Sequence, residues 1–496
     1  MASTARLILA SLLFLVPLSH AAEIRAGSEL QVQLTSPVAT YSSKPGDAVS
    51  AVLTAPVEVK GKLLLPAGVG VTGRVTSVRK VGWGFVNEKA RILLDFDKLL
   101  LPDQSEIPIG SKLVEVENAR EEVDRTGTVR GIRATASLSA SISSRLIHLP
   151  ALNLYIDPVM LGYHLLFPVF PESEIYLPRG TDLRLRLMTP VSVPELPDNR
   201  PPELDDADAA KVLSVAEAIP ERSLAGKAAN PKPADFVSIL FLGDRVQLED
   251  AFRAAQWSST DSRSRRSFWR YFGTFLANSG YKTAPMSKQW LGGNLPDQAW
   301  QKSFNSVAKR HHLRIWRLPG SPLGEGAWVA TATRDIGMSF SLRHLRVIHF
   351  VEGDVDRERS KVVNDLAFAG CVAAYSYVTR PGLNKTGLTP EGDLMTTDSR
   401  LAAIRLKTCK PNAAPPENLA QSRPFGPPFQ RYVRRQVLTF RNEILRGNVF
   451  WGTYAGVRFV WRTLRPRRDL DLSFPDPEWS QEARNLVPLE PIARGE

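Results

Sequence analysis

The chain has 496 residues, a formal net charge of +12, 43% hydrophobic residues and two cysteines. Because a single hydrophobic core stops growing near about 250–300 residues, this length predicts more than one domain. The hydrophobic content is ordinary for packed protein and excludes a wholly disordered chain. Two cysteines exclude a disulfide-built scaffold and a four-cysteine zinc site. The basic charge favours an acidic partner but says nothing about the fold.

Residues 1–21 have the pattern of a secretory signal peptide. Arg6 supplies the positive charge, an apolar run follows over residues 7–18, and small residues stand at Ser19 and Ala21. The run is shorter than the roughly 20 apolar residues of a membrane span, so a retained anchor is the less favoured alternative. We expect cleavage after Ala21 and export to the periplasm or the cell envelope.

Residues 22–195 predict an all-β domain, because short alternating segments are separated by proline and glycine turn signals. Residues 27–38 and 180–191 align without gaps and share a glycine, two leucines, a proline and a valine. A domain that begins and ends on the same strand pattern favours a barrel that is closed or nearly closed, since closure removes exposed strand edges.

The remainder of the chain predicts an α+β domain at residues 235–410, between two linkers and before a C-terminal segment. The first linker, 196–234, is acidic and rich in proline and alanine; the second, 411–430, is rich in proline; and 431–496 is basic and aromatic with an acidic end. The expected elements are helices at 206–219, 245–256, 264–277 and 355–369, strands near 236–242, 310–317, 327–333 and 345–351, and a hairpin over 371–409.

The two cysteines lie at the ends of this hairpin. If residue 375 lies opposite residue 405, Cys371 lies opposite Cys409 across the base of the hairpin. Disulfides persist in oxidising compartments, and this one would stabilise the fold by about 3–4 kcal/mol in the chain-entropy model. Two buried free thiols are the alternative.

Histidines gather in the α+β domain: four of the seven lie between residues 311 and 349. On a strand, His312, Arg314 and Trp316 share one face and His311 lies on the other. His312, His349, Asp335 and Asp354 are therefore the candidate catalytic groups if the domain is an enzyme. The alternatives are a satisfied buried histidine pair and, for Asp354, a helix N-cap. No metal-ligand spacing is present, so no metal and no cofactor is predicted.

A second hypothesis for the same strand is an anion-binding site. Arg314, beside His312 and Trp316, has the fork geometry that binds phosphate or carboxylate. Residues 249–317 also carry twelve Lys and Arg against four Asp and Glu. A solvated basic surface is the alternative explanation.

The ordered motifs of this domain resemble the LssY C-terminal family, named after a component linked to bacterial type I secretion. The similarity extends over residues 235–410 and rests on the segments 236–243, 284–287, 297–301, 311–316, 331–336 and 349–358. The resemblance names the domain and implies no established activity or ligand.

The N-terminal domain, residues 24–195, also resembles the β-barrel of type IV secretion and conjugation core-complex scaffolds. The resemblance rests on residues 64–68, 71–75, 92–96 and 101–104, with Gln104 where that family has glycine. It implies an envelope β-barrel, with secretion machinery as one candidate partner.

The C-terminal segment concentrates the positive charge: residues 431–468 hold ten arginines and one acid, Glu443. Apolar residues repeat along one helical face, and aromatic residues follow, as in helices that lie on anionic lipid. The predicted membrane-contact residues are Arg434, Arg441, Trp451, Arg458 and Trp461. The alternative is a helix packed on the preceding domain. Nucleic acid is not expected as a partner of an exported protein.

The sequence thus favours an exported envelope protein of binding or structural type, with an anionic ligand for the LssY-like domain and a lipid surface for the basic segment. The alternative is a hydrolase of a phosphate-bearing or lipid substrate that uses the four candidate catalytic groups.

Overall fold

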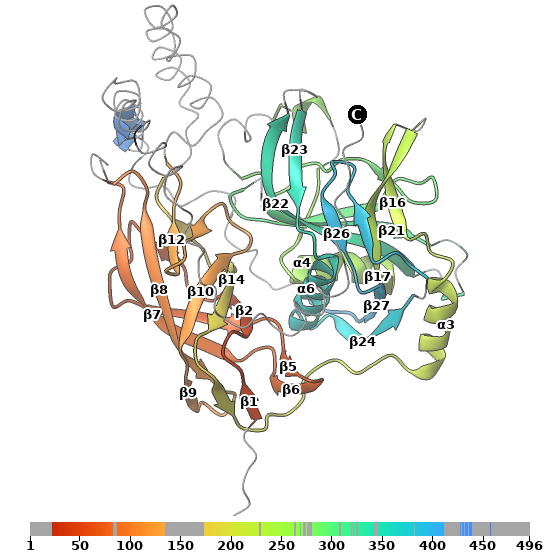
Figure 1. The fold of residues 1–496 in the computed structure, drawn as a ribbon, viewed down its shortest axis with the longest axis horizontal. Helices are drawn as coiled ribbons and strands as arrows, with labels where there is room; N and C mark the ends of the chain where they lie inside the picture. Colours follow the sequence, from red (N-terminus) through yellow and green to blue (C-terminus); the bar gives the residue numbers. More distant parts are fainter. Residues whose placement is uncertain are drawn as a thin grey trace, which may run out of the picture.

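The structure, a computed structural model, describes residues 22–410 and a few positions between 427 and 457 (Figure 1). Within the first range it omits 83–86, 134–172, 228–229, 262–263, 268, 271–273, 275–279, 307–308, 319, 321, 324–325, 342–345 and 381. The predicted signal peptide and most of the C-terminal segment lie outside the described residues.

The N-terminal domain is a β-barrel-like sheet, as predicted, with the strand order β10-β14-β2-β4-β7-β8-β12-β11 and β9 paired with β8. At the two ends of this order β10 lies beside β11, so the sheet is nearly closed (Figure 1). The strands are β1 (Ala22–Ile24), β2 (Glu29–Leu34), β3 (Val38–Ala39), β4 (Ala48–Leu53), β5 (Val57–Val59), β6 (Lys62–Leu65), β7 (Gly70–Arg79), β8 (Arg91–Leu100), β9 (Glu106–Pro108), β10 (Ser111–Val116), β11 (Glu122–Val123), β12 (Thr128–Arg130), β13 (Tyr176–Leu177), β14 (Asp182–Leu187) and β15 (Val191–Val193).

The two repeated segments of the sequence are neighbours in this sheet. They form β2 and β14, which pair antiparallel with Leu30 opposite Leu185 and Val32 opposite Leu183. All four side chains are at most 1% exposed and belong to the barrel core. The repeat therefore marks the two strands by which the beginning and the end of the domain meet.

One glycine of the barrel is required by close packing. At Gly73, where the β7–β8 register shifts, a Cβ atom would lie 2.0 Å from the carbonyl oxygen of Asp95. Real Cβ atoms do not come this close to backbone, so only glycine lets the two strands approach here.

The second domain is α+β, as predicted. Its sheet has the order β18-β20-β21-β22-β17-β16-β19, with β23 on β22, β27 parallel to β17 and β24 antiparallel to β27. Its elements are α3 (Asp206–Ala216), β16 (Arg222–Lys227), β17 (Asn230–Leu242), α4 (Arg245–Ala254), β18 (Ser258–Ser259), β19 (Gln289–Trp290), β20 (Gln298–Lys302), β21 (Arg310–Arg317), β22 (Ala327–Ser341), β23 (Arg346–Val351), α6 (Val355–Phe368), β24 (Val372–Thr379), β25 (Thr386–Leu388), β26 (Leu394–Thr396) and β27 (Arg400–Leu406).

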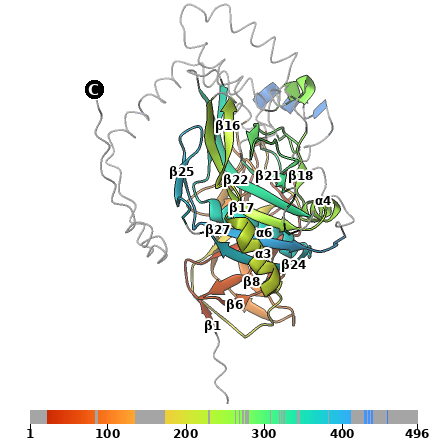
Figure 2. The ribbon, with the colours of Figure 1, turned by 90° about the vertical axis from the view of Figure 1, so that its right-hand side faces the viewer.

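Helices cover both faces of this sheet. Phe252 of α4 and Leu366 of α6 pack with Ile239 and Ile315 on one face, which is the face toward the barrel (Figure 1). Val212 of α3 packs with the other face, and Figure 2 shows α3 in front of β24. Among the described residues, no helix is long and apolar enough to cross a membrane.

The predicted linker 196–234 needs a correction, because the sheet already begins within it. β16 and the first residues of β17 form an antiparallel pair over 222–236. The segment is polar and rich in proline and alanine, so its sequence shows no alternation; its strand character comes from backbone pairing with β17 and β19. β22 is likewise longer than the expected 327–333, because β23 pairs with its distal half.

A disulfide bond joins Cys371 to Cys409, with their Cα atoms 5.1 Å apart. The bond closes the end of the β24–β27 hairpin. Tyr375 lies opposite Ile404, one residue from the predicted pairing, and a further register shift lies beside Val372. The cysteines lie just outside β24 and β27, so the strand register does not fix their pairing.

Candidate functional site

Three of the four candidate catalytic side chains meet at Asp335. Its strand, β22, lies between β21 and β23, so that Arg310 is opposite Asp335 and His312 is opposite Thr333 on one side. On the other side β23 pairs Val351 with Asp335 and His349 with Met338, and the register shift between Asp335 and Gly337 lies in between. The imidazole of His349 reaches Asp335 from that position. The side chains of His312 and Asp335 are 7% and 3% exposed, and that of His349 is 23% exposed.

Both oxygens of Asp335 have partners. Nε2 of His312 lies 3.0 Å from Oδ1, Nε of Arg310 donates to Oδ2 over 2.8 Å, and Nδ1 of His349 lies 3.1 Å from Oδ2. The hydroxyl of Thr333 contacts the same imidazole, 3.1 Å from Nδ1 of His312.

The charges around Asp335 decide its protonation. Burial raises the pKa of its carboxyl, but His312, His349 and Arg310 together lower it further, so the pKa lies well below its usual range. Asp335 is therefore an ionised carboxylate that contacts three neighbouring side chains. A carboxylate in this state holds the imidazole rings in place.

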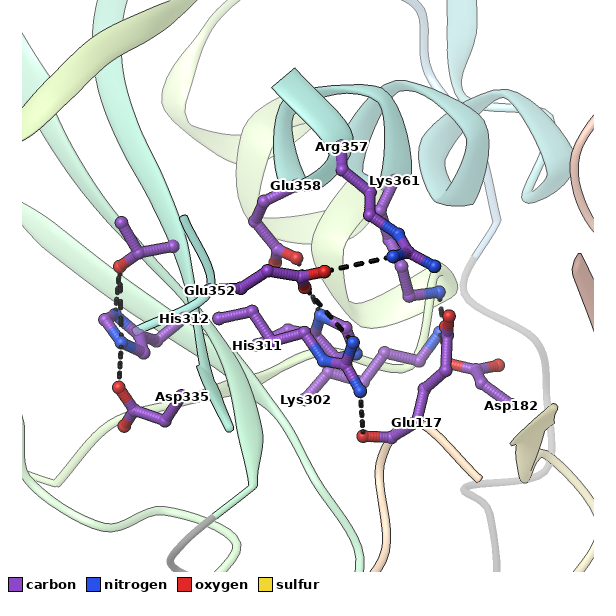
Figure 3. A network of polar contacts seen from close by, with 12 residues as sticks. Glu117, Asp182, Lys302, His311, His312, Asp335, Glu352, Arg357, Glu358 and Lys361 are labelled. Atoms are coloured by element: carbon purple, nitrogen blue, oxygen red, sulfur yellow. Dashed lines mark hydrogen bonds and ion pairs between the residues drawn. The ribbon is translucent and has the colours of Figure 1, made fainter. Parts of the chain in front are cut away.

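His311 points to the opposite face of β21, as the alternation of the strand predicts. Its Nδ1 lies 2.8 Å from Oε2 of Glu358 on α6, and its ring lies against that of Trp257. Figure 3 shows His312 with Asp335 at one side of the strands, and His311 with a group of interdomain charges at the other.

These interdomain charges were not predicted from the sequence. Lys302 of β20 and Lys361 of α6 place their ammonium groups 3.1 Å and 3.2 Å from Oδ2 of Asp182, which belongs to β14 of the barrel. Asp365, one turn after Lys361, accepts from both lysines over 3.1 Å and 3.0 Å. The four side chains are between 3% and 5% exposed.

A second group of charges continues this interface. Arg334 of β22 binds Glu115 of the barrel and Glu352 of its own domain, and donates to the backbone oxygen of Glu117. Arg184 of β14 binds Glu117 through Nε and Nη2, over 3.1 Å and 2.7 Å. The surrounding cations hold the pKa of Glu117 well below its usual range in spite of complete burial.

Uncharged groups complete the junction. The side-chain amide of Asn305 accepts from the backbone NH of Arg120 and donates to both carboxylate oxygens of Glu121. The backbone NH of Phe304 donates to the carbonyl oxygen of Asn118 over 2.7 Å. Backbone and side chains of both domains thus pair within one buried surface.

Comparison with family models gave one match, which lies in the second domain. Residues 219–401 match the family described as LssY C-terminus. We refer to this part as the LssY-like domain. The match starts before residue 235, in agreement with the early start of the sheet at β16.

Two other comparisons add little. Comparison with curated proteins gave no match. The solved structure of ComB10 of the Com type IV secretion system of Helicobacter pylori is similar at 11% sequence identity, over 36% of this chain and 95% of that chain, with a TM-score of 0.20. A TM-score this low supports no conclusion about fold or function.

Asp354, the fourth candidate, does not join the Asp335 cluster. It caps α6 of the LssY-like domain, where its Oδ1 accepts from the backbone NH groups of Asp356 and Arg357, each over 3.1 Å. Burial raises the pKa of its carboxyl, and the bonds from the helix N-terminus oppose that effect. The structure therefore gives this residue the N-cap role that was the alternative.

The predicted anion site is also corrected. Arg314 is 3% exposed and donates to Oδ2 of Asp235 over 2.8 Å and to Oγ of Ser287 over 2.9 Å. Trp316 is 2% exposed and donates from its indole nitrogen to the carbonyl oxygen of Asn294. Arg314 already has a carboxylate of its own domain, and that partner lies 79 positions away in the sequence.

The membrane-contact prediction fails at Arg434. This side chain is buried against the barrel, where it donates to Oε1 of Glu174 over 2.8 Å and to the carbonyl oxygen of Gly82 over 3.0 Å. Leu438, one turn later, is 1% exposed and belongs to the barrel core. The segment is packed at these positions, as in the alternative, but it packs on the N-terminal barrel and not on the domain that precedes it. Arg441, Trp451, Arg458 and Trp461 lie outside the described residues.

Among the described residues, no group of three or more His, Cys, Asp and Glu side chains could hold a metal ion. The Asp335 cluster fits that result, since its two histidines contact different oxygens of a single carboxylate. What this arrangement does chemically is to fix β21, β22 and β23 against one another with buried charge.

Proposed function

We propose that the protein is an exported cell-envelope protein of structural or binding type, in which the barrel and the LssY-like domain work as one unit. The observation that carries the proposal is the buried charge at their junction. Three carboxylates of the barrel interact with cations of the LssY-like domain. Asp182 pairs with Lys302, and Glu115 pairs with Arg334. Glu117 lies near Lys361 and Arg334.

Buried charges favour a single arrangement of the two domains. An ion taken out of water is costly unless it is paired, so any displacement of one domain would leave several charges without partners. Such a junction suits a protein that must transmit or resist force, or present two surfaces at a fixed spacing. Other envelope components are the natural partners, and secretion machinery is one candidate. Nucleic acid is not expected as a partner of an exported protein.

Export is supported by the signal-like residues 1–21 and by the Cys371–Cys409 bond. Disulfide bonds persist in the periplasm and are rare in the reducing cytosol. A Cys371–Cys409 bond therefore fits a chain that folds in an oxidising compartment.

The test compares the full chain with a variant that lacks residues 2–21. Cells are fractionated, and free thiols are alkylated before and after reduction. The full chain should be found in the periplasmic or envelope fraction with Cys371 and Cys409 unreactive until reduction, and the shortened variant should stay in the cytosol with reactive thiols. Reactive thiols and a cytosolic location for the full chain would refute the proposal.

The basic segment 431–468 supports a further part of the proposal, contact with anionic lipid. Since Arg434 is bound to the barrel, contact would fall to later residues such as Arg441 and Arg458. Purified protein should co-sediment with vesicles containing phosphatidylglycerol and lose this binding when residues 439–468 are deleted. Unchanged binding by the deletion variant would contradict this part alone.

The hydrolase alternative retains one favourable observation, the meeting of His312, His349 and Asp335 within hydrogen-bond distance. Against it, Asp335 is buried and already contacts three side chains of its own domain, and Asp354 is a helix cap. A stoichiometric metal in purified protein, or hydrolysis of a phosphate ester that Asp335→Asn abolishes without loss of folding, would favour the enzyme.

A further inference from the structure

The LssY-like domain carries two buried ammonium groups that converge on one oxygen atom. Lys302 and Lys361 lie 3.1 Å and 3.2 Å from Oδ2 of Asp182, and the other oxygen of this carboxylate accepts from Nε2 of Gln33 over 2.8 Å. Asp182 and Gln33 belong to the barrel, whereas both lysines belong to the other domain.

The two lysines also have an anion of their own domain that holds them. Asp365 of the same domain binds Lys302 through Oδ2 and Lys361 through Oδ1, and the indole NH of Trp257 donates to Asp365 over 3.0 Å. Three elements, β20, α6 and the chain after α4, thus hold the ammonium groups in place from within the LssY-like domain. Side chains held in this way form a built site.

The charge balance makes the site an anion acceptor. Within the LssY-like domain, Lys302 and Lys361 carry two positive charges against the single negative charge of Asp365, and each lysine side chain is only 5% exposed. Glu117 of the barrel also attracts Lys361. A buried surplus of positive charge is costly until an anion neutralises it. The lysines lower the pKa of Asp182 to about 2 in spite of burial, which shows how strongly the site favours the anionic form.

The ligand that fits is a carboxylate. In the bound carboxylate of Asp182, Oδ2 lies near both ammonium groups and Oδ1 accepts from the side-chain amide of Gln33. A cavity of about 40 Å³ lies beside Lys302 and is also lined by Gln33, Gln256 and Asp365 among others. It has the size of one or two water molecules, so it provides no space for a bulky anion.

We propose that Lys302, Lys361, Asp365 and Trp257 form a carboxylate-binding site of the LssY-like domain, and that Asp182 of the barrel is its intramolecular ligand. The proposal deepens the binding role given above, since the anion that this domain accepts is an acidic side chain of its neighbour. The site takes one carboxylate of a small acid or of an aspartate.

The test is chemical rescue of the full chain. Asp182→Ala removes the three carboxyl atoms, and formate replaces them. The variant should unfold several degrees below wild type, and its unfolding midpoint should rise with formate more than with chloride at equal ionic strength, as ligand linkage requires. The midpoint of the wild-type protein should show no such difference.

Two matched variants serve as controls. Leu183→Ala opens an apolar cavity at the next position of β14 and should gain nothing from formate. Asp182→Ala combined with Lys302→Met should lose the rescue, because one of the two cations is gone. If Asp182→Ala does not fold unaided, the yield of native protein on refolding with and without formate replaces the midpoint.

Equal responses to formate and chloride, or a formate response that persists without Lys302, would overturn the assignment. The experiment uses purified protein, so its failure would leave the export test unaffected. A protein found in the cytosol could, in turn, still show the rescue.

Discussion

Lys361→Met is the sharpest test of the interdomain charges. The ammonium group lies 3.2 Å from Asp182 and 3.0 Å from Asp365. At an effective dielectric constant of about 20, each attraction is worth about 5 kcal/mol, and the loss of hydration by the buried ions offsets most of the sum. The intact group therefore contributes little net free energy, but its disruption is costly.

Removal of Lys361 alone leaves Asp182 and Asp365 to share Lys302. One negative charge is then buried without a partner, and breaking a buried pair in this way costs about 3–5 kcal/mol. We expect Lys361→Met to lower the free energy of unfolding by that amount in urea titrations followed by tryptophan fluorescence and circular dichroism. Lys211→Met is the matched control, since that side chain is 55% exposed and its loss should cost less than about 0.5 kcal/mol.

A double variant tests whether the unpaired buried charge causes the loss of stability. Lys361→Met with Asp365→Asn restores a balance of one lysine and one aspartate, and the amide still accepts from Trp257. The loss in unfolding free energy of the double variant should therefore be smaller, by about 1–3 kcal/mol, than the summed losses of the two single variants. A loss below about 1 kcal/mol for Lys361→Met, or strictly additive losses, would refute the view that unpaired charge is what this junction avoids.

Three further predictions concern pH, packing and the C-terminal segment. The pKa of Asp182 is lowered to about 2 from 3.8, so its contribution of about 2–3 kcal/mol is complete above pH 3.8 and disappears as the pH falls through 2. Acid titration of the unfolding free energy should lack this component in Asp182→Asn. Gly73→Ala should lower the thermal unfolding midpoint through a clash worth about 1–3 kcal/mol or more, whereas Gly337→Ala, whose Cβ would meet only a ring atom at 3.6 Å, should change it little. Arg434→Met should leave Glu174 buried without its cation and cost about 3 kcal/mol of stability. The chain around residue 434 should then become accessible to limited proteolysis, and Arg434→Lys should restore part of the protection. Equal protease resistance of wild type and Arg434→Met would contradict the role of this ion pair.

The sequence pattern was sufficient to predict structure where the interacting residues are close in the sequence or where a segment is repeated. Alternation over 310–317 predicted β21 and the two faces on which His311 and His312 lie, and the repeat at residues 27 and 180 predicted a barrel whose ends meet. The hairpin geometry brought Cys371 near Cys409, because their strands are adjacent in sequence and few registers are available.

The same patterns failed where a side chain's partner lies in another part of the sequence. The local sequence of Arg314 is typical of an anion-binding residue, but its side chain is paired with Asp235. The local sequence of Arg434 is typical of a lipid contact, but its side chain is paired with Glu174. β16 was missed for a related reason, since its strand state comes from backbone pairing with β17 and β19 and its own side chains show no alternation.

The sequence by itself determined the class of each domain and the order of most of its long strands and helices, and it offered the cysteine pair and the histidine cluster as hypotheses. Only the tertiary structure decided the partner of each charge, because an isolated lysine such as Lys361 on a helix has the same pattern whether it faces water or a buried carboxylate. Electrostatic energy depends on distance in space and on burial, and neither quantity is encoded in the spacing of residues along the chain. The junction of Asp182 with Lys302 and Lys361 therefore becomes apparent only when the barrel and the LssY-like domain are seen together.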